Sequence, residues 1–328
     1  MINKTVKNYR ILEHLGEQAT GWVYRAEDTR DGRHVTLKFL PYELVEDPAA
    51  MERFVREAKA ASALEHPNIG TIYEIDEAED GRLFLARAYY EGEALETKLE
   101  QGPLPVDEAV ALCKQIASGL AEAHRNGIVH RDMVPANVLV TRAGGVKILD
   151  FGLAKMVSGG GLTQVGWSLG TPEYMSPEQI RGDDSKPTTD IWAVGVVLYE
   201  MLTGKQPFVG KNLAQVLTAI QQGRPKPLRE LRPEVPTALQ RIVDRLLAKE
   251  ADDRYADCEA LSADLEHWNA PAEHGDEPAA DGPSSRPLGV GTTEPASDAT
   301  KEEQIKALLG ALLITLLALG IMTWAYFG

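Results

Sequence analysis

The loop from His130 to Asn137 contains side chains suited to chemistry on a phosphate. Its sequence is His-Arg-Asp-Met-Val-Pro-Ala-Asn. Asp132 provides a carboxylate that can act as a base toward a hydroxyl group, and Asn137 provides an amide oxygen that can bind a magnesium ion. Val134 lies where such chemistry would favour a cation. The loop therefore indicates phosphoryl transfer, with one positive charge missing.

Two short apolar segments follow this loop and predict a hairpin. The segments are 138–140 and 146–149, and the residues between them, 142–145, are typical of a turn. Such a hairpin brings Asn137, just before the first strand, beside Asp150, just after the second. An amide oxygen and a carboxylate then converge on one point, as a hard cation that bridges phosphates requires.

The part of the chain before Tyr90 has a strand-like pattern that one helix interrupts. The strand-like segments include 35–37 and 83–85. The helix is predicted from a 3.6-residue period, which places four residues on one face: Phe54, Glu57, Ala58 and Ala61. A carboxylate on this apolar face needs a partner. We expect Lys38, at the end of its strand, to pair with Glu57.

After Tyr90 the pattern becomes helical. Asp107 is expected to cap a helix that ends at Gly127, and Asp190 is expected to open a second helix that ends at Gly204. The first of these helices has an apolar face made of Ala109, Leu112, Ile116, Leu120 and Ala123.

These motifs together resemble a bacterial, eukaryotic-like serine/threonine protein kinase, from about Tyr9 to Trp268. The likeness rests on several ordered segments: Val35-Thr36-Leu37-Lys38, Glu57, the two motifs above with Asp150-Phe151-Gly152, Gly170 to Glu178, Asp190-Ile191-Trp192 and Arg254. The resemblance implies an α+β, two-lobed kinase fold. Its N-lobe, about 9–88, is mainly β with one key helix, and its C-lobe, about 89–268, is mainly α.

The resemblance also implies a role for each matching residue, with ATP and Mg²⁺ as cofactors and protein Ser/Thr hydroxyls as substrates. The implied catalytic residues are Asp132, Lys38, Glu57 and Asn137. The implied nucleotide-binding residues are Gly16, Gly21, Val23, Thr36, Lys38, Leu139 and Asp150. The implied metal ligands are Asn137 and Asp150. Asp190 would brace the catalytic loop, and Glu178 would pair with Arg254 as a structural support.

The segment from Gly152 to Glu178 corresponds to the activation segment of such kinases. Thr163 or Ser168 is the expected phosphorylation site, and Thr171 is expected to pack near Asp132 and favour Ser/Thr substrates. Arg131 precedes the expected base, and an arginine there commonly pairs with a phosphorylated segment.

Four departures from the family pattern cluster around the nucleotide. Gln18 replaces a glycine of the phosphate-covering loop, Thr36 replaces an alanine against the adenine ring, and Val134 replaces a lysine that contacts the transferred phosphate. Arg87 lies at a position that is normally apolar, where it could compete with Lys38 for Glu57.

These departures leave three classes of function open. The first is a slow kinase, which the retained acidic, amide and lysine residues favour. The second is a pseudokinase scaffold that binds nucleotide without efficient transfer. The third is a small-molecule phosphotransferase, which the intact segment 170–178 disfavours because that segment serves peptide docking.

The C-terminal region differs sharply in composition. Residues 269–304 are expected to form a disordered linker, because 270–304 contains eight Asp/Glu, two Lys/Arg and few apolar residues. Residues 305–327 are expected to form a transmembrane helix, since Ala307 to Phe327 is an uncharged apolar run of 21 residues. The flanking Lys301 and Lys306 predict a kinase domain in the cytoplasm, tethered to the cytoplasmic membrane.

The chain stops at Gly328, which leaves a tail anchor without an external sensor or a truncated sequence as alternatives. Self-association at the membrane would favour phosphorylation in trans. The net charge of −15 argues against nucleic acid as a partner. Cys113 and Cys258 are expected to be reduced thiols, because both fall in helical segments of a cytoplasmic domain.

Overall fold

The computed structural model describes residues 1–18, 21–41, 48–151 and 172–269. The chain divides into two units, and the first, Met1–Gly275, contains all of these residues. The predicted linker, apart from its first residue, and the predicted transmembrane helix at 305–327 lie outside them. No helix within the described ranges is long and apolar enough to cross a membrane.

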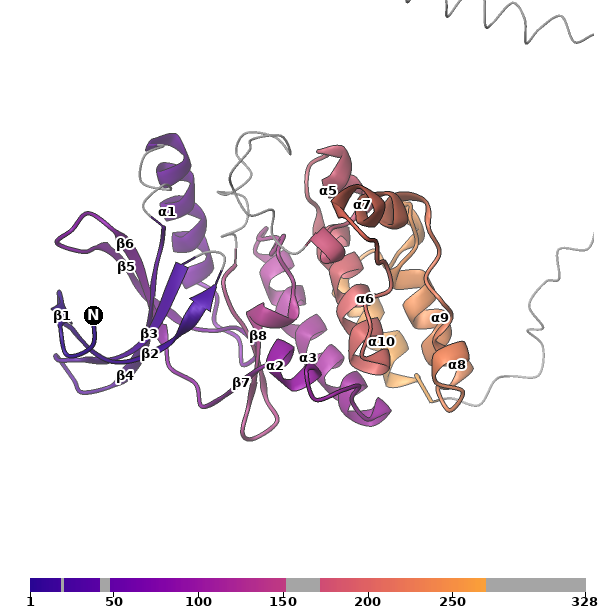
Figure 1. Cartoon of the computed structure of the whole chain (residues 1–328), viewed down its shortest axis with the longest axis horizontal. Coiled ribbons are helices and arrows are strands. Elements are labelled where there is room, and N and C mark those ends of the chain that lie inside the picture. The colour runs from indigo at the N-terminus through magenta and orange to yellow at the C-terminus, as the bar shows by residue number, and fades with distance from the viewer. Residues whose placement is uncertain (19–20, 42–47, 152–171, 270–328) are drawn as a thin grey trace, which may run out of the picture. The chain divides into compact units, whose positions relative to one another are not determined.

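The N-terminal part is a six-stranded antiparallel sheet with one helix beside it (Figure 1). Its strand order is β1-β2-β3-β4-β6-β5. The strands are β1 (Thr5–Val6), β2 (Tyr9–Gln18), β3 (Gly21–Asp28), β4 (His34–Phe39), β5 (Ile72–Glu77) and β6 (Leu83–Ala88). Helix α1 (Pro48–Ser62) connects β4 to β5 and packs against β5. The expected mainly-β lobe with one helix is confirmed.

One face of β4 packs in the core, and the other carries polar side chains. Val35, Leu37 and Phe39 point into an apolar cluster and are fully buried. Because side chains alternate along a strand, Thr36 and Lys38 point to the opposite face. This alternation fixes the lysine on the face that carries the candidate site.

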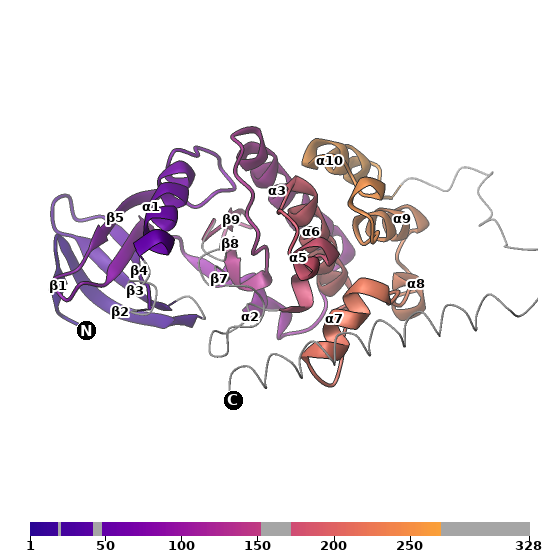
Figure 2. The ribbon, with the colours of Figure 1, turned by 90° about the horizontal axis from the view of Figure 1, so that it is seen from above.

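The C-terminal part is helical and carries a small three-stranded sheet, β7 (Gly92–Ala94), β8 (Val138–Thr141) and β9 (Val146–Ile148). Figure 2 shows α3 and α6 among the other helices. The helices are α2 (Leu95–Leu99), α3 (Val106–Arg125), α5 (Pro177–Arg181), α6 (Pro187–Thr203), α7 (Leu213–Gln222), α8 (Leu228–Leu231), α9 (Thr237–Leu246) and α10 (Cys258–Glu266).

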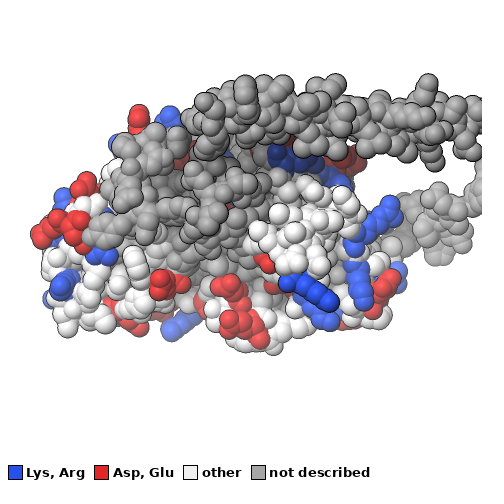
Figure 3. Space-filling model, turned by 45° about the horizontal axis from the view of Figure 1, so that its top comes forward, with Lys and Arg blue, Asp and Glu red and all other residues white. Residues whose placement is uncertain are grey.

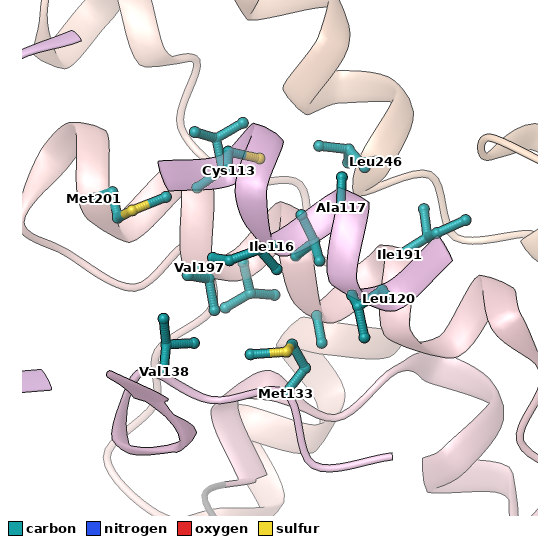
Figure 4. Packing of buried hydrophobic residues seen from close by; sticks show 14 of the residues in the cluster. Cys113, Ile116, Ala117, Leu120, Met133, Val138, Ile191, Val197, Met201 and Leu246 are labelled. Carbon is teal, nitrogen blue, oxygen red and sulfur yellow. The ribbon is translucent and has the colours of Figure 1, made fainter. Parts of the chain in front are cut away.

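Helices α3 and α6 form the centre of the C-terminal core. Figure 4 shows Ile116 and Leu120 of α3 packed near Val197 of α6, with Met133 of the loop from His130 to Asn137 beside them. These side chains are at most 1% exposed. Each buried aliphatic side chain of this size stabilises the fold by about 1.5–3 kcal/mol. The loop from His130 to Asn137 is therefore anchored in this core through Met133.

Both predicted C-terminal helix ends are correct, and both predicted helix starts are wrong, since α6 begins at Pro187 and Asp190 lies in its first turn. Gly127, two residues after the last residue of α3, has a φ of 73°, and Gly204 ends α6 with a φ of 65°. Asp107 does not cap α3, because the N-cap residue is Pro105 and no side chain caps the helix. Asp107 lies in the first turn, where its negative charge interacts favourably with the positive end of the helix dipole.

Charged side chains of both signs are interspersed on the face drawn in Figure 3. Exposed pairs of this kind contribute about 0–1 kcal/mol each, so the core dominates stability. Cys113 and Cys258 are unpaired and buried, as expected, and burial raises the pKa of the Cys113 thiol to about 12. Both are therefore neutral core thiols.

Candidate active site

The hairpin of β8 and β9 places Asn137 beside Asp150. The strands pair in antiparallel register, with Val138 opposite Ile148, and the backbone N–H of Leu149 donates to the Asn137 carbonyl at 2.9 Å. Asn137 ends a short 3-10 turn, Pro135–Asn137, and Asp150 follows β9 by two residues. The predicted hairpin and its effect on these two residues are confirmed.

Asn137 holds the carboxylate of Asp132 in place. Its side-chain nitrogen donates to the Asp132 backbone oxygen at 2.8 Å and to Asp132 Oδ2 at 3.0 Å. The side-chain oxygen of Asn137 therefore lies on the other side of its amide. One residue thus orients the expected base and keeps an oxygen available for a cation.

Asp190 holds the backbone of the loop from His130 to Asn137, as the family resemblance implied. Its carboxylate accepts hydrogen bonds from the backbone N–H groups of His130 and Arg131, each at 2.8 Å. His124 Nε2 lies 2.7 Å from the same carboxylate, a contact that the sequence had not indicated. Arg131 has a φ of 68°, which is uncommon for a side chain of this size. The hydrogen bonds to Asp190 stabilise that conformation.

A second set of contacts joins the loop to the residues around Asp150. His130 Nε2 lies 2.9 Å from the Leu149 carbonyl, and the His130 ring packs against the Phe151 ring with centroids 4.6 Å apart. Phe151 is 3% exposed and belongs to the C-terminal core. The backbone that carries Asp150 is therefore fixed on both sides.

Asp150 lies between two cations. Lys38 Nζ donates to its Oδ2 at 2.7 Å, and Arg87 Nη1 donates to its Oδ1 at 2.5 Å. All three residues are at most 6% exposed. Burial alone would raise the pKa of Asp150, but the charges of Arg87 and Lys38 outweigh it and lower this pKa to about 2. The carboxylate is therefore ionised at neutral pH.

The expected pair of Lys38 and Glu57 is wrong for this structure. Both oxygens of Glu57 instead accept from Arg131 Nη1, at 3.1 and 3.0 Å. The pair is about a fifth to a quarter exposed, so the contact joins α1 to the catalytic loop near the surface. Arg131 is the residue that we expected to bind a phosphorylated segment, and it is bound here to the carboxylate on α1.

The expected partner of Arg87 is also wrong. Arg87 does compete with Lys38 for a carboxylate, but that carboxylate is Asp150 and not Glu57. The strand register explains the proximity, because Arg87 of β6 lies opposite Thr36 of β4 and diagonal to Lys38 on the same face.

The glycines of the expected phosphate-covering loop lie in the turn region of β2 and β3. Gln18 pairs with Gly21, and Gly16 pairs with Val23 across these strands. Gly21 has a φ of 127°, and a Cβ there would come within 1.8 Å of the Phe39 carbonyl oxygen. Only glycine therefore fits at this close approach of two strands.

The comparison with known families decides the classification. The Pkinase family model, described as the protein kinase domain, matches residues 9–265. The chain belongs to the protein kinase family. The unit from Met1 to Gly275 contains this kinase domain, and the match covers both the sheet and the helical part.

The kinase domain is similar to those of several curated bacterial proteins. It is 40% identical over 259 residues to the probable serine/threonine-protein kinase PknB of Lactococcus lactis subsp. lactis (strain IL1403), covering 78% of this chain and 41% of that protein. It is 38% identical over 275 residues to the serine/threonine-protein kinase pkn3 of Myxococcus xanthus, covering 80% and 50%. The chain therefore spans half or less of the length of these relatives.

The fold of the kinase domain is similar to a solved kinase structure. The crystal structure of the Mycobacterium tuberculosis PknI kinase domain has a TM-score of 0.67 and 26% sequence identity, and the match covers 82% of this chain and 99% of that chain. The two-lobed kinase fold expected from the sequence is confirmed.

The remaining predicted residues have clear places in the kinase domain. Thr36 and Val23 are buried, and Leu139 is half-buried on the face of β8 opposite the core residues Val138 and Val140. Val134 is 7% exposed and packs in the C-terminal core. The side chain that replaces the family lysine is thus part of the apolar core.

Two residues that contact the loop from His130 to Asn137 or its brace Asp190 were not predicted from the sequence. The predictions for the activation segment lie outside the described residues. Gln179 Nε2 donates to the Arg131 carbonyl at 3.0 Å, and His124 contacts Asp190. Gln179 is far from the loop in sequence, whereas His124 lies six residues before His130 on α3, and neither belongs to a motif that the sequence reveals. The predicted phosphorylation sites Thr163 and Ser168 lie outside the described residues, as does Thr171.

Proposed function

We propose that this chain is a serine/threonine protein kinase that transfers the γ-phosphate of ATP to Ser/Thr hydroxyls of proteins. The observation that carries the proposal is the hydrogen-bonded unit of Asp132 and Asn137 next to the ionised Asp150. Its relatives are named serine/threonine-protein kinases at 37–40% identity, which supports the same class of substrate.

Each side chain has a role that its contacts support. Asp132, held by Asn137, would accept the proton of the substrate hydroxyl and orient that hydroxyl toward the phosphate. Lys38, already directed at Asp150, would hold the phosphates of the nucleotide. A base of this kind contributes about 10²–10⁴-fold to the rate.

The residues present fit a magnesium ion. Asp150 offers an ionised carboxylate and Asn137 an amide oxygen, and Mg²⁺ prefers oxygen ligands of this type. These two residues would hold the ion. When bound, Mg²⁺ neutralises charge on the phosphates. Within the described residues no cluster of three or more His, Cys, Asp or Glu offers a competing metal site.

The proposal is tested by phosphate transfer from labelled ATP. The purified chain is incubated with Mg²⁺ and a generic protein substrate, and the labelled amino acid is identified after acid hydrolysis. We expect phosphoserine or phosphothreonine from the wild type and none above background from Asp132→Asn. Equal labelling by both proteins would reject the kinase assignment.

Reduced activity is part of the proposal. Val134 replaces a cation at the transferred phosphate, and one charge-assisted hydrogen bond is worth about 1.5–3 kcal/mol. Its loss slows transfer by about 10- to 100-fold. Gln18 adds a side chain where the family has glycine. We therefore expect a turnover well below the 1–100 s⁻¹ typical of kinases.

A pseudokinase scaffold is the second candidate, and one observation favours it. Lys38 and Glu57 are bound to Asp150 and Arg131 respectively, and not to each other. A kinase needs the lysine–glutamate pair in place for transfer. Thermal stabilisation by nucleotide without any transfer, under conditions where a control kinase is active, would identify the scaffold.

Membrane attachment through 305–327 rests on the sequence alone. Its apolar length and flanking lysines support a single-pass anchor with the kinase domain in the cytoplasm. Anchoring would raise the local concentration of copies and favour phosphorylation in trans. Deleting 305–328 should remove the protein from the membrane fraction and lower autophosphorylation in vesicles, and an unchanged distribution would reject the anchor.

A further inference from the structure

Asp150 has both carboxylate oxygens bound to cations of the protein itself. Arg87 Nη1 contacts Oδ1 and Lys38 Nζ contacts Oδ2, at 2.5 and 2.7 Å. The side chains of the three residues are 1–7% exposed. Water therefore screens these contacts little, and a cation that binds this carboxylate must compete with them.

The position of Arg87 is built into the sheet. It lies on β6 directly opposite Thr36 and on the face that also carries Lys38. An arginine side chain stays positively charged in proteins under ordinary conditions. Arg87 can therefore be removed from Asp150 only by movement of its side chain, and not by loss of a proton.

A divalent ion at Asp150 would lie next to these two fixed positive charges. Lys38 is compatible with such an ion, because the phosphates of a nucleotide carry enough negative charge to bind the lysine and the metal ion together. Arg87 is a second cation, bound to the other oxygen of the same carboxylate, and it adds a positive charge where the ion would bind. The guanidinium and a metal ion thus compete for the negative charge of one carboxylate, and at this short distance the two cations repel each other.

We propose that Arg87 competes with Mg²⁺ for Asp150 and so raises the Mg²⁺ concentration that nucleotide binding requires. The inference rests on the proposed binding of nucleotide with Mg²⁺. It assigns to Arg87 the role of a positioning residue, which holds the metal-binding carboxylate in a cation-bound state when Mg²⁺ is scarce. Nucleotide binding then responds to Mg²⁺ at higher concentrations than it would with an apolar residue at position 87.

The test is a Mg²⁺ titration of the thermal shift that a fixed ADP concentration produces. Wild type is compared with Arg87→Leu, which leaves Lys38 on Asp150 and places an apolar side chain in a buried position. Arg87→Met, closer in length to arginine, is the second variant if the leucine protein does not fold. Arg10→Leu, an exposed arginine of the same sheet that pairs with Glu27, is the control for the change in net charge.

We expect the half-saturating Mg²⁺ concentration to fall about tenfold or more in the Arg87 variants, since one charge-assisted contact is worth at least that factor. The Arg10 control should match the wild type. Equal Mg²⁺ requirements for wild type and Arg87→Leu would overturn the inference and leave the kinase proposal intact. Weaker ADP binding by Arg87→Leu at every Mg²⁺ concentration would also overturn it, because Arg87 would then bind the nucleotide. No ADP-induced shift in any of the proteins would overturn the inference together with the proposed function.

Discussion

Replacing Glu178 by glutamine should strongly destabilise the kinase domain. Arg254 makes five hydrogen bonds, which use all five of its N–H donors. Two go to Glu178, at 2.8 and 2.9 Å, and the others go to backbone carbonyls. The arginine side chain is fully buried and Glu178 is 8% exposed. Glutamine would leave the guanidinium charge buried without a counter-charge.

The magnitude follows from this burial. Breaking a buried ion pair on one side costs about 3–5 kcal/mol. For a domain of this size, that corresponds to a fall in Tm of about 6–20 °C. Burial alone would raise the pKa of Glu178, but its contacts with Arg254 lower it. The stabilisation is therefore complete at neutral pH and is lost as the pH falls through that lowered pKa.

The assay is thermal unfolding followed by circular dichroism at pH 7 and at pH 3. The matched control is Asp183→Asn, which breaks the exposed pair of Arg181 and Asp183 at the end of the same helix. We expect the control to change stability by at most about 0.5 kcal/mol. A Glu178→Gln protein within that range of the wild type at pH 7 would refute the reasoning.

Three further predictions concern the site. Gly21→Ala should lose about 1–3 kcal/mol of stability, measured by urea unfolding, because its Cβ would meet a backbone oxygen of β4 at 1.8 Å; an unchanged midpoint would contradict this. Asp190→Asn should lower both Tm and the transfer rate, since its carboxylate binds two backbone N–H groups of the catalytic loop, and normal transfer would reject that role. Arg131→Met should speed amide exchange in α1 several-fold, because Glu57 loses its contact with the loop, whereas unchanged protection would show that the contact is dispensable.

The sequence predicted the elements of the fold well, because local patterns determine them. Short apolar segments at 35–37 and 83–85 predict strands, and a 3.6-residue period predicts α3. The hairpin that joins Asn137 to Asp150 was predictable for the same reason, since a short turn between two apolar segments leaves few alternatives. The Asp107 cap failed because Pro105 begins the helix earlier than the first polar residue suggests.

The ion pairs of the site were less predictable. The sequence shows which side chains are charged and which face of an element they share, but not which carboxylate meets which cation. Two carboxylates could accept a hydrogen bond from Lys38: that of Glu57 on α1 and that of Asp150 in the C-lobe. The choice depends on the position of α1 relative to the sheet, which is a tertiary property. The sequence placed Arg87 near Lys38 only through the family resemblance, and the strand register that puts both on one face came from the structure.

The rate of phosphate transfer by wild type and Asp132→Asn, measured side by side at saturating Mg²⁺ and ATP, tests the central claim most directly. The account predicts a wild-type rate at least about 10²-fold above that of the variant, because the variant loses its base. It also predicts the same ADP-induced thermal shift for both proteins, since the proposed role of Asp132 is toward the substrate hydroxyl and not toward the nucleotide. Equal transfer rates, or no transfer by either protein, would contradict the assignment of this chain as an active kinase.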